Sequence, residues 1–332
     1  METVREQICA AEHSILSPYA AFSDKSAGRL RAEDECPLRT VFQRDRDRII
    51  HSRAFRRLKH KTQVFLSPEG DHYRTRLTHT LEVSQIARTI SAALRLNQDL
   101  TEAIALGHDL GHTPFGHAGE RALDSVCPEG FRHYEQSLRV VDSLEKDGKG
   151  LNLTFEVRNG IERHTCGDEA KTLEGRVVRL ADVIAYINHD IEDACRADVM
   201  REDDIPKKLR DVLGRTKSER INTLVLSAIE NSRGDISLSD DIKEAFDELH
   251  CFMFKKVYTN VVCKGEETKA VDLIKWLYYY FVNNPDKLPD LYKRISLQNG
   301  IERASCDYIA GMSDRFAVKT FEGLFVPKSW IY

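Results

Sequence analysis

The sequence HDLGHTPFGHAGE occupies residues 108–120 and decides how the rest of the chain is interpreted. It follows an apolar segment with helical spacing over residues 99–110, and it continues into a turn punctuated by Gly and Pro over residues 111–116. Four ionisable side chains lie beside that turn: His108, Asp109, His112 and His117. Such a concentration is typical of a metal-binding or proton-transfer site, whereas a lone His-Asp dipeptide is expected by chance.

Histidine is unevenly distributed around this stretch. Eight of the 12 histidines fall between residues 51 and 133. Neutral imidazole is the commonest metal ligand, and a mixed imidazole and carboxylate set suits Mn, Fe, Ni, Co, Zn or Mg. Because thiolates are missing from the set, it does not read as a structural zinc site. The alternative is that each histidine is a hydrogen-bonded core or surface residue.

Composition places the chain among globular proteins. It has 332 residues, 41% of them hydrophobic, and a net charge of −4, which argues against disorder and against wholesale coating of DNA or membrane. No segment approaches the roughly 18 to 20 apolar residues of a membrane span, and the charged N-terminus lacks a secretory signal. The eight scattered cysteines read as reduced thiols, so we expect a cytoplasmic protein without membrane contact.

Apolar residues recur mainly at helical spacing, so the sequence predicts an all-α fold. We expect an N-terminal arm over residues 1–38, a helical core over residues 39–200, and a C-terminal helical lobe over residues 201–332 packed on the core. The lobe is expected to contain five or six helices.

Four local predictions concern individual segments. Residues 40–61 are predicted to form one helix, and residues 39–61 hold nine Lys or Arg against two Asp. Residues 63–73 are predicted to form a turn or short hairpin around Ser67-Pro68-Glu69-Gly70. Asp99 is expected to cap the helix that precedes residue 111. A long helix is expected over residues 173–200.

The spacing of several motifs in order resembles one enzyme family. Residues 42–50 (FQRDRDRII), 55–58 (FRRL), 61–65 (KTQVF), 76–79 (RLTH), 108–120 and 307–317 (DYIAGMSDRFA) are similar to the bacterial deoxyguanosine triphosphate triphosphohydrolases. They also resemble the wider HD-domain deoxynucleotide triphosphohydrolases. The resemblance runs from about residue 28 to 320 and implies an HD-domain helical core with additional C-terminal helices.

The resemblance implies a reaction and the residues that carry it. A deoxynucleoside triphosphate and water would give a deoxynucleoside and intact inorganic triphosphate. One divalent ion would be held by His79, His108, Asp109 and Asp182. The family's catalytic His and Glu fall at His117 and Glu120, and its other active-site histidines at His112 and His133. A histidine at the turn can move a proton, which is typically worth about 10²- to 10⁴-fold in rate.

Substrate contacts are predicted partly from helix geometry. Asp182, Tyr186 and Asp190 are spaced i, i+4 and i+8, so all three share one helix face. The family uses the matching positions for the deoxyribose, with Tyr186 against C2′ and with Asp190 and Gln63 on the 3′-hydroxyl. Guanidinium groups suit phosphates, and the candidates for the triphosphate are Arg44, Arg48, Arg57 and Arg76.

Two other functions stay open at this point. One is a different HD phosphohydrolase that acts on nucleoside monophosphates or cyclic nucleotides. The other is a nucleotide- or nucleic-acid-binding protein with weak catalysis, which the basic segment over residues 39–61 motivates. The resemblance also implies a homo-oligomer, a tetramer or hexamer, and, as a further partner, an activating nucleotide or single-stranded nucleic acid.

Overall fold

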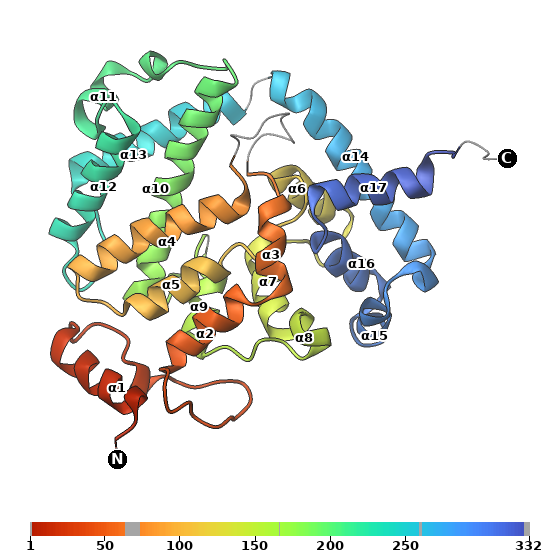
Figure 1. Cartoon of the computed structure of the whole chain (residues 1–332). Coiled ribbons are helices and arrows are strands. Elements are labelled where there is room, and N and C mark those ends of the chain that lie inside the picture. The colour runs from red at the N-terminus through yellow and green to blue at the C-terminus, as the bar shows by residue number, and fades with distance from the viewer. Residues whose placement is uncertain (1, 64–73, 166, 259–260, 329–332) are drawn as a thin grey trace. The chain divides into compact units, whose positions relative to one another are not determined.

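The apolar segment before the His-Asp pair forms helix α5 (Gln98–Gly107) in a computed structural model (Figure 1). The model describes residues 2–63, 74–165, 167–258 and 261–328. Asn97 caps α5, because its side chain accepts a hydrogen bond from the backbone N–H of Leu100. The prediction that Asp99 is the cap is therefore wrong. Asp99 instead accepts a hydrogen bond from Gln43 Nε2, at 2.9 Å.

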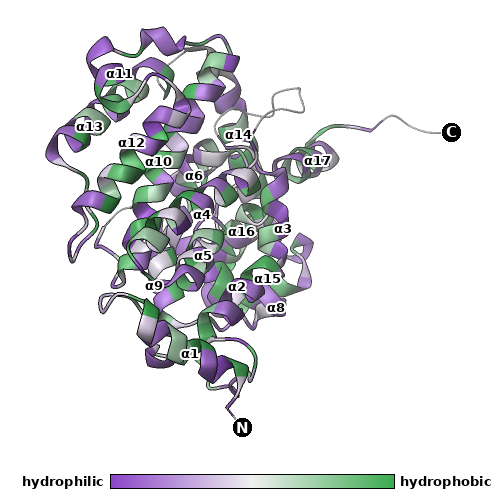
Figure 2. Cartoon of the chain, turned by 60° about the vertical axis from the view of Figure 1, so that its left-hand side comes forward, coloured by the Kyte–Doolittle hydropathy of each residue, from purple (hydrophilic) through white to green (hydrophobic). Residues whose placement is uncertain are grey.

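The fold is all-α, as predicted. In the described part of the chain, β-structure is limited to two isolated bridges, Arg29 with Thr154 and Thr62 with Thr75. Within the same residues, no helix is both long enough and apolar enough to span a membrane. Green hydrophobic and purple hydrophilic segments alternate along the helices (Figure 2), as expected for amphipathic helices that bury one face.

The chain divides into two compact units that are interleaved along the sequence. Unit 1 comprises residues 1–51, 79–108 and 151–261, and unit 2 comprises residues 52–78, 109–150 and 262–332. One of the crossings falls between His108 and Asp109, two consecutive residues. The division into an arm, a core and a C-terminal lobe, with boundaries at residues 38 and 200, stays a prediction.

Unit 1 is built around α5, which packs against α2, α9 and α10. Phe42, Ile49, Leu100, Ile104 and Ile161 are fully buried between these helices. The elements of unit 1 are α1 (Val4–Ile15), η1 (Ser23–Lys25), α2 (Val41–Ile50), α4 (Arg76–Ala93) from His79 onward, α5, α9 (Phe155–Glu162), α10 (Leu173–Arg196), η4 (Glu202–Asp204), α11 (Lys207–Leu213), α12 (Lys217–Asn231), α13 (Asp240–Met253) and η5 (Phe254–Tyr258).

Unit 2 has its own hydrophobic core, to which α6, α14 and α16 contribute Leu123, Ile274, Leu277 and Ile309, and the segment after α6 contributes Phe131. The elements of unit 2 are α3 (Arg53–Arg57), η2 (Leu58–His60), α6 (Gly116–Val126), α7 (His133–Arg139), η3 (Val140–Leu144), α8 (Glu145–Gly148), α14 (Val261–Asn283) from Val262 onward, η6 (Pro285–Lys287), α15 (Asp290–Asn299), α16 (Ile301–Ala310) and α17 (Asp314–Phe325).

The structure changes three of the local predictions. The helix predicted over residues 40–61 is interrupted, because α2 ends at Ile50 and Ser52 caps a new helix by accepting from the N–H of Phe55. The long helix ends at Arg196, four residues before its predicted end. The described part of the chain after residue 203 contains seven α-helices, α11 to α17, rather than five or six. The turn predicted over residues 63–73 lies outside the described residues, apart from Gln63.

Candidate active site

Unit 1 gathers imidazoles around one carboxylate, that of Asp182 on α10. Asp182 Oδ1 lies 3.0 Å from His79 Nε2 and 3.8 Å from His108 Nε2. His108, His164 and Asp182 each offer a ligand atom, and these atoms lie within 4.8 Å of one another. The structure thus brings together the three predicted ligands that belong to unit 1, and it adds His164.

Backbone carbonyls fix the orientation of two of these imidazoles. His108 Nδ1 donates to the carbonyl of Ala105 at 2.6 Å, and His164 Nδ1 donates to that of Ile161 at 2.7 Å. A carbonyl can only accept, so the ring proton lies on Nδ1 and the Nε2 lone pair is available as a ligand. This is the outer hydrogen bonding that metal-ligating histidines usually have, so the residues fit a divalent ion.

His79 is held by a longer chain of contacts. Its Nδ1 lies 3.3 Å from Nδ1 of His189, and His189 Nε2 lies 3.0 Å from Glu82 Oε2. His189 thus lies against the ring of His79 and connects it to Glu82. Two imidazoles, His79 and His189, are thus linked in a row with the Asp182 carboxylate at one end and the Glu82 carboxylate at the other.

One face of α10 continues from Asp182 to Tyr186 and Asp190, as the i, i+4, i+8 spacing predicts. Asp190 is buried, and Tyr186 is half-buried with its ring 5.9 Å from that of His250. Burial raises the pKa of the Tyr186 phenol, and the nearby carboxylates of Asp182 and Asp190 raise it further. The phenol therefore stays protonated at neutral pH and presents a flat ring beside two carboxylates.

Unit 2 contains the turn between Asp109 and α6. Arg76 Nη1 donates to Asp109 Oδ2 at 2.6 Å, and both side chains are buried. Phe115 and Gly116 have left-handed backbone angles, with φ of 62° and 57°, so the chain reverses sharply before α6 begins. The Cβ of any other residue at position 116 would lie only 3.1 Å from the carbonyl of Gln63, which favours glycine there.

Three histidines of unit 2 surround Glu120. His133 Nδ1 lies 3.0 Å and His117 Nδ1 lies 3.4 Å from the carboxylate of Glu120. The ring of buried His112 stacks on that of His133, with centroids 4.7 Å apart. All four predicted catalytic residues therefore lie in one cluster, in which His112 and His133 also approach Asp109.

The charges in this cluster shift its pKa values in opposite directions. Burial lowers the pKa of His112 far below its usual range, and the positive charge of Arg76 adds to that effect. Burial alone would also lower the pKa of His133, but its hydrogen bond to Glu120, together with the negative charges of Glu120 and Asp109, raises that pKa. Burial opposes ionisation of Glu120, yet hydrogen bonds from His117 and His133 hold its pKa well below the usual range. The cluster thus combines a neutral imidazole with a proton-holding imidazole.

The turn is braced by residues from both ends of unit 2. The buried Lys61 ammonium donates to the carbonyl of His112 and, at 2.9 Å, to that of Ala310. Asp314 accepts from the backbone N–H of Phe115 at 3.0 Å and from the N–H and hydroxyl of Thr62 at 2.9 and 2.7 Å. The C-terminal motif over residues 307–317 therefore holds the strained turn in place.

The remaining predicted substrate residues lie in different surroundings. Gln63 is buried in unit 2, and its Oε1 has no hydrogen-bond partner within the described residues. Arg44 in unit 1 pairs with Glu33 at 3.2 Å, and Arg48 pairs with the same carboxylate at 2.7 Å. Arg57 lines a pocket in unit 2. The substrate roles of these residues stay predictions.

Sequence reasoning missed three residues of these clusters: His164, Lys61 in its bracing role, and Asp314. His164 stands in no motif singled out above, so its type alone gave no signal. Lys61 and Asp314 lie within two of the quoted motifs, over residues 61–65 and 307–317, and that position was the available signal.

Comparisons with known proteins identify the domains of this chain. The chain matches the HD domain over residues 76–187 and the phosphohydrolase-associated domain over residues 236–323. A phosphohydrolase from Bacteroides thetaiotaomicron has a similar fold, with a TM-score of 0.53 and 17% identity over 83% of this chain and 68% of that one. Fold and sequence thus define an HD-domain protein.

Proteins with higher sequence identity show which family of HD-domain proteins the chain belongs to. A deoxyguanosinetriphosphate triphosphohydrolase-like protein from Caldanaerobacter subterraneus subsp. tengcongensis is 57% identical over 98% of this chain and 97% of its own length. One from Desulfatibacillum aliphaticivorans is 48% identical over 98% of this chain and 99% of its own. The chain belongs to this family of deoxyguanosinetriphosphate triphosphohydrolase-like proteins.

Proposed function

We propose that this protein is a metal-dependent hydrolase that converts a deoxynucleoside triphosphate, dGTP or several dNTPs, into a deoxynucleoside and inorganic triphosphate. The observation that carries the proposal is the group of His79, His108 and His164 around Asp182, with two of the imidazoles fixed in the ligand tautomer. Family membership supports it, because the named relatives are triphosphohydrolase-like.

The proposed ligands of the divalent ion are His79, His108, Asp109 and Asp182. Asp109 follows His108 directly in the chain, and its carboxylate is already held by Arg76. A divalent ion held by these residues supplies Lewis acidity, which activates water and offsets phosphoryl charge. The native ion, among Mn, Mg, Fe, Co, Ni and Zn, is left to experiment.

The histidine cluster of unit 2 is proposed to move protons. Glu120 holds a proton on His133 and lies beside the exposed His117, so an imidazolium can give its proton to the departing 5′-oxygen. His112 is neutral because of burial and the charge of Arg76, so it can accept a hydrogen bond or a proton. Both imidazole states needed for acid and base work are therefore present in one cluster.

Substrate binding is proposed to use the phosphate-binding Arg76 and the sugar-binding face of α10. Arg76 Nε is buried and has no hydrogen-bond partner within the described residues, so its guanidinium keeps a donor for phosphate beyond Asp109. Tyr186 would exclude a 2′-hydroxyl by packing, and Asp190 and Gln63 would bind the 3′-hydroxyl. Packing alone rejects an added hydroxyl by only about 10²-fold, whereas a required hydroxyl is selected more strongly.

The test is a product analysis. Protein supplemented with Mn, Mg or Co is incubated with each dNTP and with GTP, singly and in mixtures, and the products are separated by ion-exchange chromatography. We expect deoxynucleoside and triphosphate from dNTPs and no product from GTP. Release of orthophosphate, or of a monophosphate product without triphosphate, would instead assign another HD phosphohydrolase activity. Activity confined to mixtures would identify an activating nucleotide.

A further inference from the structure

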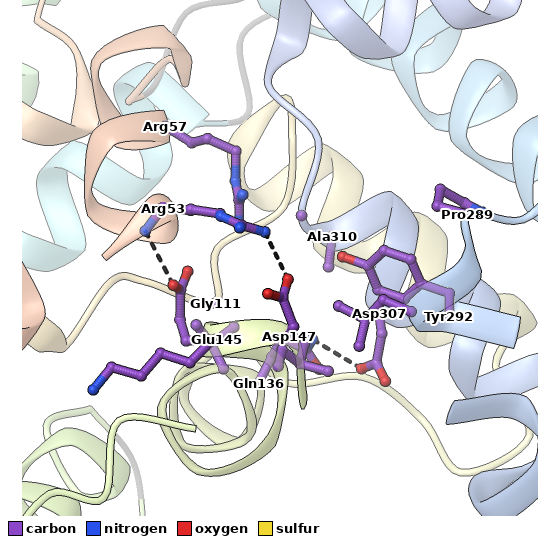
Figure 3. Close-up of a pocket in the computed structure, with 15 residues that line it drawn as sticks. Arg53, Arg57, Gly111, Gln136, Glu145, Asp147, Pro289, Tyr292, Asp307 and Ala310 are labelled. Atoms are coloured by element: carbon purple, nitrogen blue, oxygen red, sulfur yellow. Dashed lines mark hydrogen bonds and ion pairs between the residues drawn. The ribbon is translucent and has the colours of Figure 1, made fainter. Parts of the chain in front are cut away.

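Unit 2 contains a pocket of about 210 Å³ that holds none of the proposed metal ligands or proton-transfer residues. It is formed by the C-terminal end of α3, the segment around α8, and α15 and α16 (Figure 3). Its charged or polar lining residues include Arg53, Arg57, Glu145, Asp147, Tyr292 and Asp307. Since all of them belong to unit 2, the pocket lies within one compact unit.

The three carboxylates of the pocket are already committed to protein donors. Glu145 accepts from the backbone N–H groups of Arg53 and Ala54 at 3.1 and 2.7 Å, and Asp147 pairs with the Arg53 guanidinium at 3.0 Å. Asp307 accepts from Gln136 and Arg139 at 3.0 and 2.8 Å. Their negative charge is therefore largely compensated before any ligand enters.

Two donors of the pocket have no such partner. Arg57 Nε is buried without a hydrogen bond, and Arg57 forms no ion pair within the described residues. Tyr292 likewise makes no side-chain hydrogen bond to another described residue, and burial raises its pKa to about 12 against the opposing charge of Arg57. Figure 3 shows the Arg57 side chain and the Tyr292 hydroxyl directed toward the same space. Arg57 and Tyr292 therefore present donors that no acceptor among the described residues satisfies.

The pocket wall also contains strained backbone. Lys146 and Asp147 are consecutive non-glycine residues with φ of 51° and 57°. Left-handed angles cost free energy for such residues, and they occur preferentially at ligand-binding and active sites. Asp147 neutralises Arg53 there, whereas the Arg57 guanidinium has no carboxylate partner among the described residues.

From these contacts we infer that the pocket binds a small phosphate-type oxyanion between Arg57 and Tyr292. A guanidinium and a phenol hydroxyl are both donors, and tetrahedral oxyanions present several acceptor oxygens to them. The volume is below the roughly 300 to 1,000 Å³ of sites for drug-sized ligands, so it suits a free phosphate better than a whole nucleotide. Gly111, which also lines the pocket, directly precedes His112 in the chain.

The same chemistry could come from free phosphate or from the triphosphate of the substrate, for which Arg57 is also a candidate. Calorimetric titration with inorganic phosphate distinguishes the two. The full chain is used without added metal and with EDTA, and Asp182→Ala is titrated alongside. We expect wild type and Asp182→Ala to bind phosphate equally. Arg57→Gln should bind it at least about tenfold more weakly, and Tyr292→Phe about threefold more weakly.

The matched control is Arg56→Gln, which removes the same charge one residue earlier on α3 and outside the pocket. It should bind phosphate like wild type. Equal weakening by both arginine variants, or no phosphate binding by wild type, would overturn the inference. So would an Arg57→Gln protein that binds phosphate normally but shows a raised KM for dNTP. Only the KM measurement depends on the proposed function, because the calorimetric titration with phosphate needs no turnover.

Discussion

The histidines of unit 1 and those of unit 2 are held in opposite ways. In unit 1, His108 and His164 direct Nδ1 at backbone carbonyls, which locks one tautomer and leaves Nε2 as a lone-pair donor. In unit 2, His133 and His117 direct Nδ1 at the carboxylate of Glu120, and for His133 this contact favours the protonated ring. A carbonyl partner thus leaves an Nε2 lone pair on His108 and His164, whereas the Glu120 carboxylate favours a proton on His133.

We expect the largest effect when the Asp182 carboxylate of unit 1 is removed. Asp182→Ala should abolish measurable turnover and metal loading, because Asp182 is the shared partner of His79 and His108. Metal content by mass spectrometry and triphosphate release measure the two effects, and circular dichroism checks the fold. Metal loading equal to wild type would show that the unit 1 histidines are not the ligands.

Removing a proton carrier of unit 2 should separate metal binding from rate. His117→Ala should keep wild-type metal content while kcat falls by about 10²- to 10⁴-fold, the usual worth of general acid–base catalysis. His117 is exposed, so its loss should not disturb the core. The same metal and turnover assays apply. A fully active His117→Ala protein would remove His117 from the proton-transfer assignment.

Glu120→Gln tests the role of the carboxylate, because it replaces the charged partner of His133 and His117 with a neutral amide. With the carboxylate gone, burial dominates and the pKa of His133 should fall below its ordinary value, as NMR titration of the His133 ring would record. Because folding raises the pKa of His133, that group stabilises the fold fully below pH about 6.5. Because folding lowers the pKa of Glu120, that group stabilises the fold fully above pH about 4.5. The difference in unfolding free energy between wild type and variant should therefore peak between those values. A pH-independent difference would contradict the pairing.

The contacts that Lys61 and Asp314 make with the turn lie within unit 2, so their loss should leave the metal content unchanged. Asp314→Asn weakens acceptors for Phe115 and Thr62 and should lower the free energy of unfolding by about 1–3 kcal/mol. Turnover should fall by about tenfold, because the turn carries His112 and His117. Urea unfolding and kcat measure both effects. Asp290→Asn, at an exposed helix start, is the matched control and should change neither.

Lys61 gives the most pH-specific effect. Burial lowers its pKa to about 7, with the charge of Arg57 adding to that shift. Since the unfolded chain binds this proton up to its ordinary pKa near 10.5, stability should rise with pH between about 7 and 10.5. Lys61→Met should remove that rise in urea unfolding measured at several pH values. The exposed Lys59→Met is the control and should retain it.

Local chemistry of the sequence was enough to predict the helices, the turn after Asp109 and the shared face of Asp182, Tyr186 and Asp190. These depend on periodicity and on residues near one another in the chain. The break at His51 and the cap at Asn97 were missed, because choosing between neighbouring polar residues as a cap depends on small energy differences. His164 was missed because nothing in its local sequence reveals that the chain folds back to Asp182.

The brace formed by Lys61 and Asp314 has a consequence for the order in which the protein is made. Asp314 is 199 residues beyond Phe115 and 252 beyond Thr62. At a ribosomal rate of about 5–20 residues per second, the His112–His117 turn therefore waits about 10–40 seconds for the residue that fixes it. A product truncated before residue 310 should therefore lack both contacts and leave the turn unheld.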